Sequence, residues 1–264
     1  MSDIYLGTIA IEPARWVNRR GRGPEQTPLV AVSEWLDQMA DAGFDGIEVW
    51  EPHLLEASDA EVDLVLEHRL PVPVFNSYVS LDDANPSARL ATAAWAVRCG
   101  STGIKYNVGN DPAAEGSYAE RIAAWLDDLP EGVALLCECH HGISIADEPK
   151  TAATIFDAAG PVHRVQAIVH THEEPDLIRA RFDAYGDRIS HVHVNFLDFD
   201  NLGAPKLDDI TDRLASQIEL LSQLGFAGTW TIEFTHGVLT DNDTPALLVR
   251  QAAEDLRVLR ECLH

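Results

Sequence analysis

A short apolar, β-branched run followed by a polar turn and a helical pattern recurs eight times along the chain. The apolar runs have the length and composition of buried strands, and they occupy residues 5–11, 46–50, 72–78, 103–107, 133–139, 165–170, 189–194 and 229–234. After each run, apolar residues recur at i, i+3 and i+4 spacing, for example over residues 29–42, 207–224 and 245–259. The chain is therefore expected to alternate strands and helices around a parallel sheet.

The number and spacing of these repeats favour a closed sheet over an open one. Eight strand–helix alternations of about 25–40 residues each predict a (β/α)8 TIM barrel, with residues 1–264 in a single domain. The alternative is a doubly wound open sheet with a glycine-rich phosphate turn after its first strand, but GRGP at residues 21–24 lacks that context. Helix boundaries agree, because SDAE at residues 58–61 predicts a helix start and Gly43 and Gly225 predict glycine-capped ends.

The charge of the chain excludes several classes of partner. With 19 basic and 43 acidic residues the formal net charge is −24, which repels phosphate backbones and anionic lipids, so neither nucleic acid nor membrane is expected as a partner. No stretch approaches 18 uncharged apolar residues and the N-terminus lacks a signal-peptide pattern, so a cytoplasmic protein is expected. The four cysteines are expected to be reduced thiols: Cys99, Cys137, Cys139 and Cys262.

Histidines and glutamates concentrate at the carboxyl ends of the expected strands, where barrels of this kind carry their chemistry. Eight of the eleven histidines fall there, at positions 53, 140, 141, 170, 172, 191, 193 and 236. Glu138, His170, His193 and Glu233 come from four successive strands and are expected to converge around the barrel axis. Two carboxylates and two imidazoles suit one divalent Mn, Co, Zn, Fe or Ni ion, whereas Mg prefers more oxygen ligands.

The neighbours of these four residues have other expected roles. His191 is expected to point inward lower in the barrel, in a structural or supporting role, and His141 is expected to face away from the site. Cys137 and Cys139 have the opposite parity to Glu138 and are expected to pack against helices. The remaining polar residues at the strand ends are expected to bind substrate: Glu48, His172, Glu173 and His236.

Several motifs resemble those of the xylose-isomerase-like TIM-barrel superfamily. The resemblance covers essentially the whole chain and is carried by GFDGIE at residues 43–48, Glu138-x-His140, His193-x-Asn195 and Ile232-Glu233. The superfamily includes sugar (phosphate) isomerases and epimerases, inosose dehydratase, hydroxypyruvate isomerase, 3-dehydroshikimate dehydratase and endonuclease IV. The resemblance implies this fold and a metal site, while the substrate stays open because one site serves many reactions.

Within the superfamily, three details are most similar to bacterial 3-dehydroshikimate dehydratase. They are LGTI at residues 6–9, the Glu48-Val49-Trp50-x-x-His53 run, and Glu138-x-His140 followed by IAD at residues 145–147. This resemblance implies that His140 is the base and that Lys105 holds a substrate carboxylate.

Two positions depart from the family pattern. His170 and Glu173 stand where the family usually has Asp followed three residues later by His, and Asn195 replaces a common Lys. An imidazole in place of a carboxylate favours Zn, Co or Ni. The missing Lys weakens the case for a phosphorylated or carboxylated substrate.

The leading hypothesis is metal-dependent proton transfer at the carbon next to a carbonyl of a small polyhydroxylated substrate. The metal would act as a Lewis acid on a developing enediolate and Glu138 and Glu233 as an acid–base pair, as in a sugar or sugar-phosphate isomerase or epimerase. If a β-hydroxyl leaves instead, the chain is a dehydratase of a dehydroshikimate-like or inosose-like substrate. His140 would then be the base, and Trp50 and His53 would line the substrate.

Two other hypotheses are less favoured. Endonuclease-like hydrolysis needs further metal ligands and a basic surface, whereas the third strand ends FNSY at residues 75–78 without histidine and the charge is −24. A non-catalytic barrel with a drifted site would explain His170 and Asn195, but the retained Glu138, His140, His193 and Glu233 argue against it. Homo-oligomers are compatible with the fold, but no interface is identified.

Overall fold

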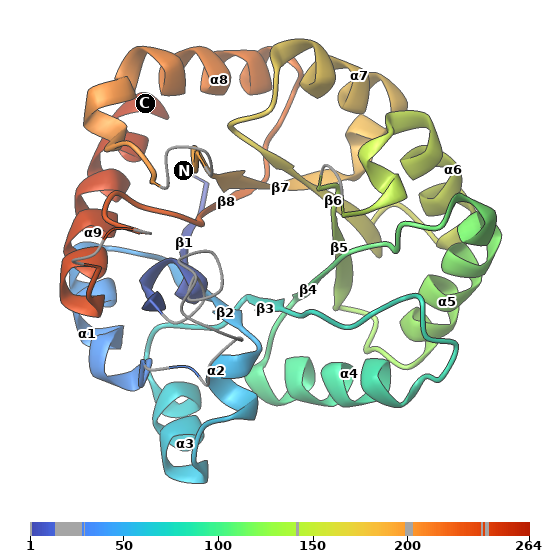
Figure 1. Ribbon diagram of the computed structural model, residues 1–264, viewed down its shortest axis with the longest axis horizontal. Helices are drawn as coiled ribbons and strands as arrows, with labels where there is room; N and C mark the ends of the chain where they lie inside the picture. Colours follow the sequence, from blue (N-terminus) through green and yellow to red (C-terminus); the bar gives the residue numbers. More distant parts are fainter. Residues whose placement is uncertain are drawn as a thin grey trace.

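The structure, a computed structural model, describes residues 2–13, 28, 30–140, 143–198, 203–238, 240 and 243–264. Within these residues eight parallel strands close into a barrel in sequence order, with β1 paired to both β2 and β8 (Figure 1). The strands are β1 (Ile4–Gly7), β2 (Gly46–Trp50), β3 (Val74–Asn76), β4 (Gly103–Tyr106), β5 (Ala134–Glu138), β6 (Val165–His170), β7 (Ile189–Val194) and β8 (Thr229–Ile232). The chain is a single-domain (β/α)8 TIM barrel, as the sequence predicts.

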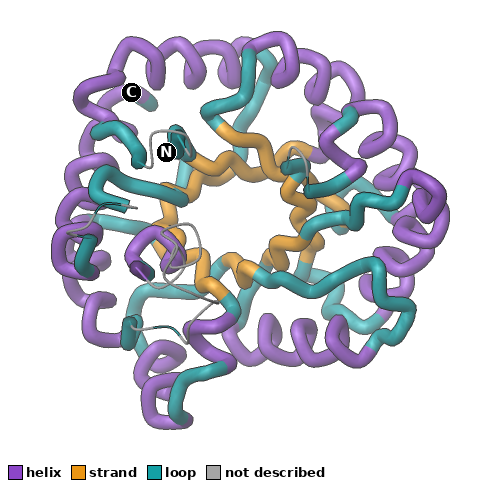
Figure 2. Tube along the Cα trace, in the orientation of Figure 1, coloured by secondary structure: helices purple, strands orange, loops and turns teal. Residues whose placement is uncertain are grey.

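Helices form a continuous ring outside the strands (Figure 2). In the described ranges they are α1 (Ser33–Ala42), α2 (Pro52–Leu55), α3 (Asp59–Glu67), α4 (Ser87–Cys99), α5 (Glu115–Asp127), α6 (Pro149–Ala159), α7 (Pro175–Tyr185), α8 (Thr211–Gln223) and α9 (Pro245–Cys262). The outward side chains of the strands pack against this ring in one large apolar core, which includes both Cys137 and Cys139. Burial of this core is the main source of stability of the fold.

The inside of the barrel is apolar toward the amino ends of the strands and polar toward their carboxyl ends. A separate cluster of Tyr5, Val74, Ala134, Leu136 and Ile168 fills the lower part. Gly103 lies beside this cluster, and a larger residue would not fit there because its Cβ would lie 2.6 Å from Leu136 Cδ1. The inward-facing polar residues come later along the strands, so they lie at the carboxyl end of the barrel.

The strand predictions for residues 46–50, 165–170 and 189–194 match the observed strands at both ends. The prediction for residues 5–11 is wrong in its second half, because Thr8–Ile11 form a 3-10 helix, η1. The hydroxyl of Thr8 accepts a hydrogen bond of 2.8 Å from the backbone N–H of Trp50. The Thr8 hydroxyl thus takes the place of a backbone carbonyl as hydrogen-bond acceptor for β2, and the chain leaves the sheet after Gly7.

The expected helix boundaries also appear. The Ser58 side chain accepts a hydrogen bond from Glu61 N at the start of α3, and Gly43 and Gly225 end α1 and α8 with φ of 101° and 86°. The predicted helices over residues 29–42 and 207–224 begin later, at Ser33 and Thr211, and Leu207–Ile210 form a 3-10 helix. Residues 21–24 and His141 lie outside the described residues. No helix of the described part combines the length and apolarity needed to cross a membrane.

Candidate metal centre

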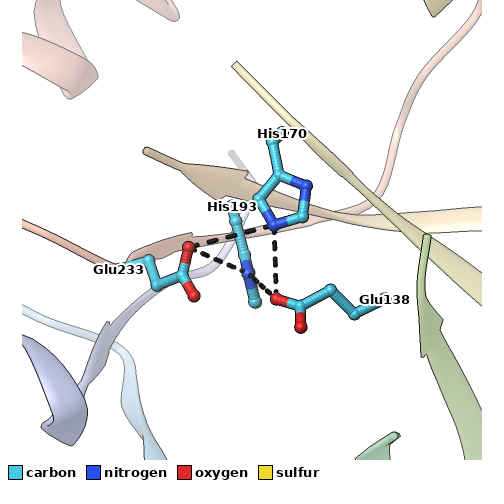
Figure 3. Close-up of side chains that lie close together, drawn as sticks. All are labelled: Glu138, His170, His193 and Glu233. Atoms are coloured by element: carbon cyan, nitrogen blue, oxygen red, sulfur yellow. Dashed lines mark hydrogen bonds and ion pairs between the residues drawn. The ribbon is translucent and has the colours of Figure 1, made fainter. Parts of the chain in front are cut away.

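Four buried side chains meet at the carboxyl end of the barrel. Glu138 and His170 end β5 and β6, His193 lies in β7, and Glu233 follows β8. One ligand atom from each lies within 4.8 Å of those of the other three. Figure 3 shows Glu138 and Glu233 approaching from opposite sides, with the two imidazoles between them. The structure thus brings together the four residues that the sequence nominates as metal ligands.

The distances among these side chains define a small shared space. His170 Nε2 lies 3.3 Å from Glu138 Oε1 and 3.9 Å from Glu233 Oε2. His193 Nδ1 lies 3.4 Å from each of the same two oxygens. Among the residues that the structure describes, this buried Nδ1 atom has no hydrogen-bond partner. A buried nitrogen without a hydrogen bond, facing two carboxylates, fits the donor set of a divalent ion.

Charge in the centre is balanced between carboxylates and imidazoles. Burial would raise the pKa of Glu138, but Lys105 and the two histidines hold it well below its usual value. Burial opposes protonation of His170, yet its contacts with Glu138 and Glu173 raise its pKa to about 9. The pKa of His193 is likewise raised well above normal despite burial, because Glu48 and Glu233 face it. Without an ion, the surrounding carboxylates therefore favour the protonated form of both imidazoles.

A further layer of polar residues holds His193 from below. Its Nε2 lies 3.0 Å from Glu48 Oε2, and Glu48 Oε1 accepts a hydrogen bond of 2.8 Å from Asn76 Nδ2. This contact directs the Nε2 proton of His193 to Glu48 and leaves Nδ1 for the shared space. His191 lies deeper, with hydrogen bonds of 2.7 and 2.9 Å to the hydroxyls of Thr229 and Thr231, which matches the structural role expected for it.

The two carboxylates have different partners, which gives them different chemistry. Glu138 Oε2 lies 2.8 Å from Lys105 Nζ and accepts a hydrogen bond of 3.1 Å from Asn107. Glu233 Oε2 accepts a hydrogen bond of 2.7 Å from Asn195 and has no salt bridge to a Lys or Arg among the described residues. Burial would raise the pKa of Glu233, but His193 lowers it. Glu138 is thus fixed by a cation, whereas Glu233 is held by a neutral amide.

The centre opens into a cavity of about 380 Å³. Four of the expected site residues line it, namely Lys105, Glu138, His140 and Glu233. The rest of its described wall consists of Ile9, Tyr78, Val79, Ser80, Leu81, Asp82, Asn107, Val108, Gly109, Ile143, Asn195 and Phe234. A cavity of this size with apolar walls and a polar floor is suited to a small organic ligand.

Three residues expected to bind substrate lie below or beside the cavity and do not line it. Glu48 supports His193 from inside the barrel. Trp50 is buried with its indole edge-on to His53, at 5.1 Å between ring centroids. His53 has both ring nitrogens occupied, at 2.9 Å from Thr8 Oγ1 and 3.0 Å from Glu12 Oε2. The 3-10 helix of residues 8–11 allows these contacts by turning Thr8 toward the end of β2.

The other three expected substrate-binding residues also lie outside the cavity wall. His172 Nδ1 donates a hydrogen bond of 3.2 Å to the Asn195 carbonyl, and burial together with the charge of His170 lowers the pKa of His172 to about 4. Glu173 is buried against α7. His236 is exposed, with Nδ1 3.0 Å from the Ala204 carbonyl. The geometry therefore does not support contact between these residues and a substrate in the cavity.

Three amides of the centre, Asn76, Asn107 and Asn195, have no role predicted from the sequence. Each of them donates a hydrogen bond to a carboxylate of the inner barrel. A signal existed for the last two, since both stand at expected strand ends. Arg181 in α7 is buried and donates a hydrogen bond to Glu173 beside the centre. The sequence does not predict this, because an arginine in an amphipathic helix usually lies on the solvated face.

Comparison with known proteins defines the family. The family model described as xylose isomerase-like TIM barrel matches residues 36–262. The chain belongs to this family. A search of curated protein sequences found no match.

Solved structures share this fold at low sequence identity. A xylose isomerase domain protein from Alicyclobacillus acidocaldarius is 17% identical, with a TM-score of 0.64 over 99% of this chain and 100% of that one. The 3-keto-D-glucoside 4-epimerase YcjR from E. coli is 18% identical, with a TM-score of 0.60 over 99% and 100% of the two chains. The IolI protein with a bound zinc atom is 12% identical, with a TM-score of 0.66 over 98% of each. These likenesses establish the fold alone.

Proposed function

We propose that this chain is a divalent-metal-dependent isomerase or epimerase of a small polyhydroxylated carbonyl compound. The observation that carries the proposal is the convergence of Glu138, His170, His193 and Glu233 beneath a cavity of about 380 Å³. The zinc atom of IolI and the epimerase name of YcjR, both proteins of similar fold, accord with it. A divalent ion in this centre supplies Lewis-acid polarisation of a substrate carbonyl.

The side chains of the centre then provide the proton transfer. Glu233 is the base that takes the proton from the carbon next to the carbonyl, because it is ionised and no Lys or Arg among the described residues pairs with it. Glu138 stands on the opposite side and stays ionised beside Lys105. Return of this proton from Glu233 to the neighbouring carbon, with transfer of the hydroxyl proton to the former carbonyl oxygen, isomerises the substrate. Epimerisation requires in addition a protonated group on the opposite face of the substrate.

The charges of the cavity favour an uncharged substrate. Lys105 is the one Lys or Arg among the lining residues that the structure describes, and its ammonium is 2.8 Å from Glu138. The same wall carries the carboxylates of Glu138, Glu233 and Asp82. Even with a divalent ion bound, the described wall offers a phosphate or carboxylate no Lys or Arg that is free of a carboxylate partner. Free ketoses and inososes are therefore better candidates than their phosphates.

A dehydratase is the second candidate, and one observation favours it. His140 lines the cavity, and its ring lies edge-on to that of His170 at 5.7 Å between centroids. In this position the imidazole of His140 faces the space above the metal ligands and serves as base for elimination of a β-hydroxyl.

The first experiment measures the metal content of the tag-free protein beside a Glu138→Ala variant, followed by turnover of ketoses, inososes and dehydroshikimate. About one divalent ion per chain, lost in the variant, with isomer or epimer as product, supports the proposal. Release of water from the substrate would instead establish the dehydratase. Absence of metal, together with no thermal shift on adding Mn, Co or Zn, would refute both and favour a non-catalytic barrel.

A further inference from the structure

An arginine in α7 is completely buried against the carboxyl ends of β5 and β6. The Arg181 side chain has no solvent exposure. Its Nη2 donates hydrogen bonds of 2.9 Å to the Cys139 carbonyl and 3.2 Å to Asp147, and its Nη1 donates one of 2.9 Å to the Tyr185 hydroxyl. A guanidinium in such surroundings needs a buried counter-charge.

Glu173 supplies that counter-charge. Its two oxygens each accept a hydrogen bond of 3.1 Å, one from Arg181 Nε and one from Arg181 Nη2. This two-point contact fixes the plane of the carboxylate, as paired hydrogen bonds between arginine and a carboxylate do. The position of Glu173 is thus set by α7 rather than by the loop on which it stands.

The fixed carboxylate faces the outer nitrogen of a metal-centre histidine. Glu173 Oε1 lies 3.7 Å from His170 Nδ1, while His170 Nε2 points to Glu138 and Glu233. Glu48 lies behind His193 at the shorter distance of 3.0 Å. In both cases a buried carboxylate lies behind the ring nitrogen that does not face the centre.

We propose that Glu173, held by Arg181, is a positioning residue for His170. It keeps the proton of His170 on Nδ1 and so leaves the Nε2 lone pair for the metal ion. Arg181 also binds the carbonyl of the residue after Glu138, so the same contact network sets the spacing between β5 and β6. This inference rests on the proposed metal site, and it replaces substrate binding as the role of Glu173.

The test compares Co²⁺ binding by Glu173→Gln with binding by Glu174→Gln, an identical change in an exposed neighbour. Affinity is measured by titration calorimetry, ligand geometry by the visible absorption of bound Co²⁺, and stability by unfolding of the metal-free proteins. Glu173→Gln is expected to lower the affinity by about 10–100-fold and to alter the absorption, whereas Glu174→Gln is expected to change neither.

A double-mutant cycle separates positioning from a general structural effect. In a His170→Ala background, Glu173→Gln is expected to cause no further loss of affinity, because the residue it positions is gone. An equal loss in both backgrounds would overturn the proposal, and so would wild-type affinity of Glu173→Gln. Failure of the wild-type protein to bind Co²⁺ would instead refute the metal site itself.

A second variant covers the case in which Glu173→Gln unfolds. Glu173→Asp keeps the charge opposite Arg181 but withdraws the carboxylate from His170 by one methylene. It is expected to remain folded and still to lose Co²⁺ affinity, and retention of wild-type affinity by this variant would overturn the proposal.

Discussion

Loading a divalent ion into the metal centre is expected to expel about two protons per ion at pH 7.5. The pKa of His170 is raised to about 9 in the ion-free protein, so this imidazole is expected to be mostly protonated at that pH. The pKa of His193 is also raised well above its normal value, so this ring is expected to carry a second proton as well. Metal ligation requires both rings to be neutral, whereas Glu138 and Glu233 are already ionised and release nothing.

The number of protons released is measured by titration calorimetry in three buffers of equal pH and different ionisation enthalpy. It is the slope of the observed binding enthalpy plotted against the ionisation enthalpy of the buffer. The expected slope is about two for the wild type and about one for His170→Ala, which has one titrating ligand fewer. The affinity of the wild type is expected to rise with pH, since protons compete with the ion. A slope near zero would refute the reasoning, because it would mean that both histidines are neutral before the ion binds.

Three further predictions concern single groups. Glu233→Gln is expected to abolish turnover while thermal unfolding stays nearly unchanged, and surviving activity would show that another group is the base. Lys105→Met leaves Glu138 buried without its cation, so urea unfolding of the ion-free protein should show a loss of about 3–5 kcal/mol, against little change for the exposed Lys150→Met. Because the pKa of His170 rises from 6.5 to about 9 on folding, its stabilising contribution is complete below about pH 6.5 and lost as the pH rises through about 9. The free energy of unfolding of the ion-free protein, measured from about pH 6 to 10, checks this prediction, and a constant value over that range would contradict it.

The barrel and the convergence of the four candidate metal ligands were predictable because they depend on periodic features of the chain. Strand length and apolar composition define β2, β6 and β7 to the residue. Once the strands are ordered in a closed parallel barrel, residues at equivalent strand ends must meet at one end of it. The convergence of Glu138 and His193 follows from that rule without knowledge of any loop.

The surroundings of the ligands were not predictable, because they depend on how loops and helices pack. The sequence gives no sign that Arg181 turns inward, since its place in α7 is also compatible with solvent. Glu173 and His53 both resemble polar strand-end residues in the sequence. The partner of Glu173 is Arg181 in the helix that follows it, and the partner of His53 is Glu12, far away in the sequence. The hydrogen bond between the Thr8 hydroxyl and Trp50 of β2 also cannot be predicted from the spacing of apolar residues.

The division between strand ends and loops has a consequence for how such a protein evolves. The candidate metal ligands stand on or next to strands, whereas much of the cavity wall comes from connecting segments, including Tyr78, Gly109 and Ile143. Insertions or substitutions in these segments reshape the wall without moving the ligands. One inherited metal centre can therefore be presented to new substrates by small, separate mutational steps, each of which leaves the reacting groups in register.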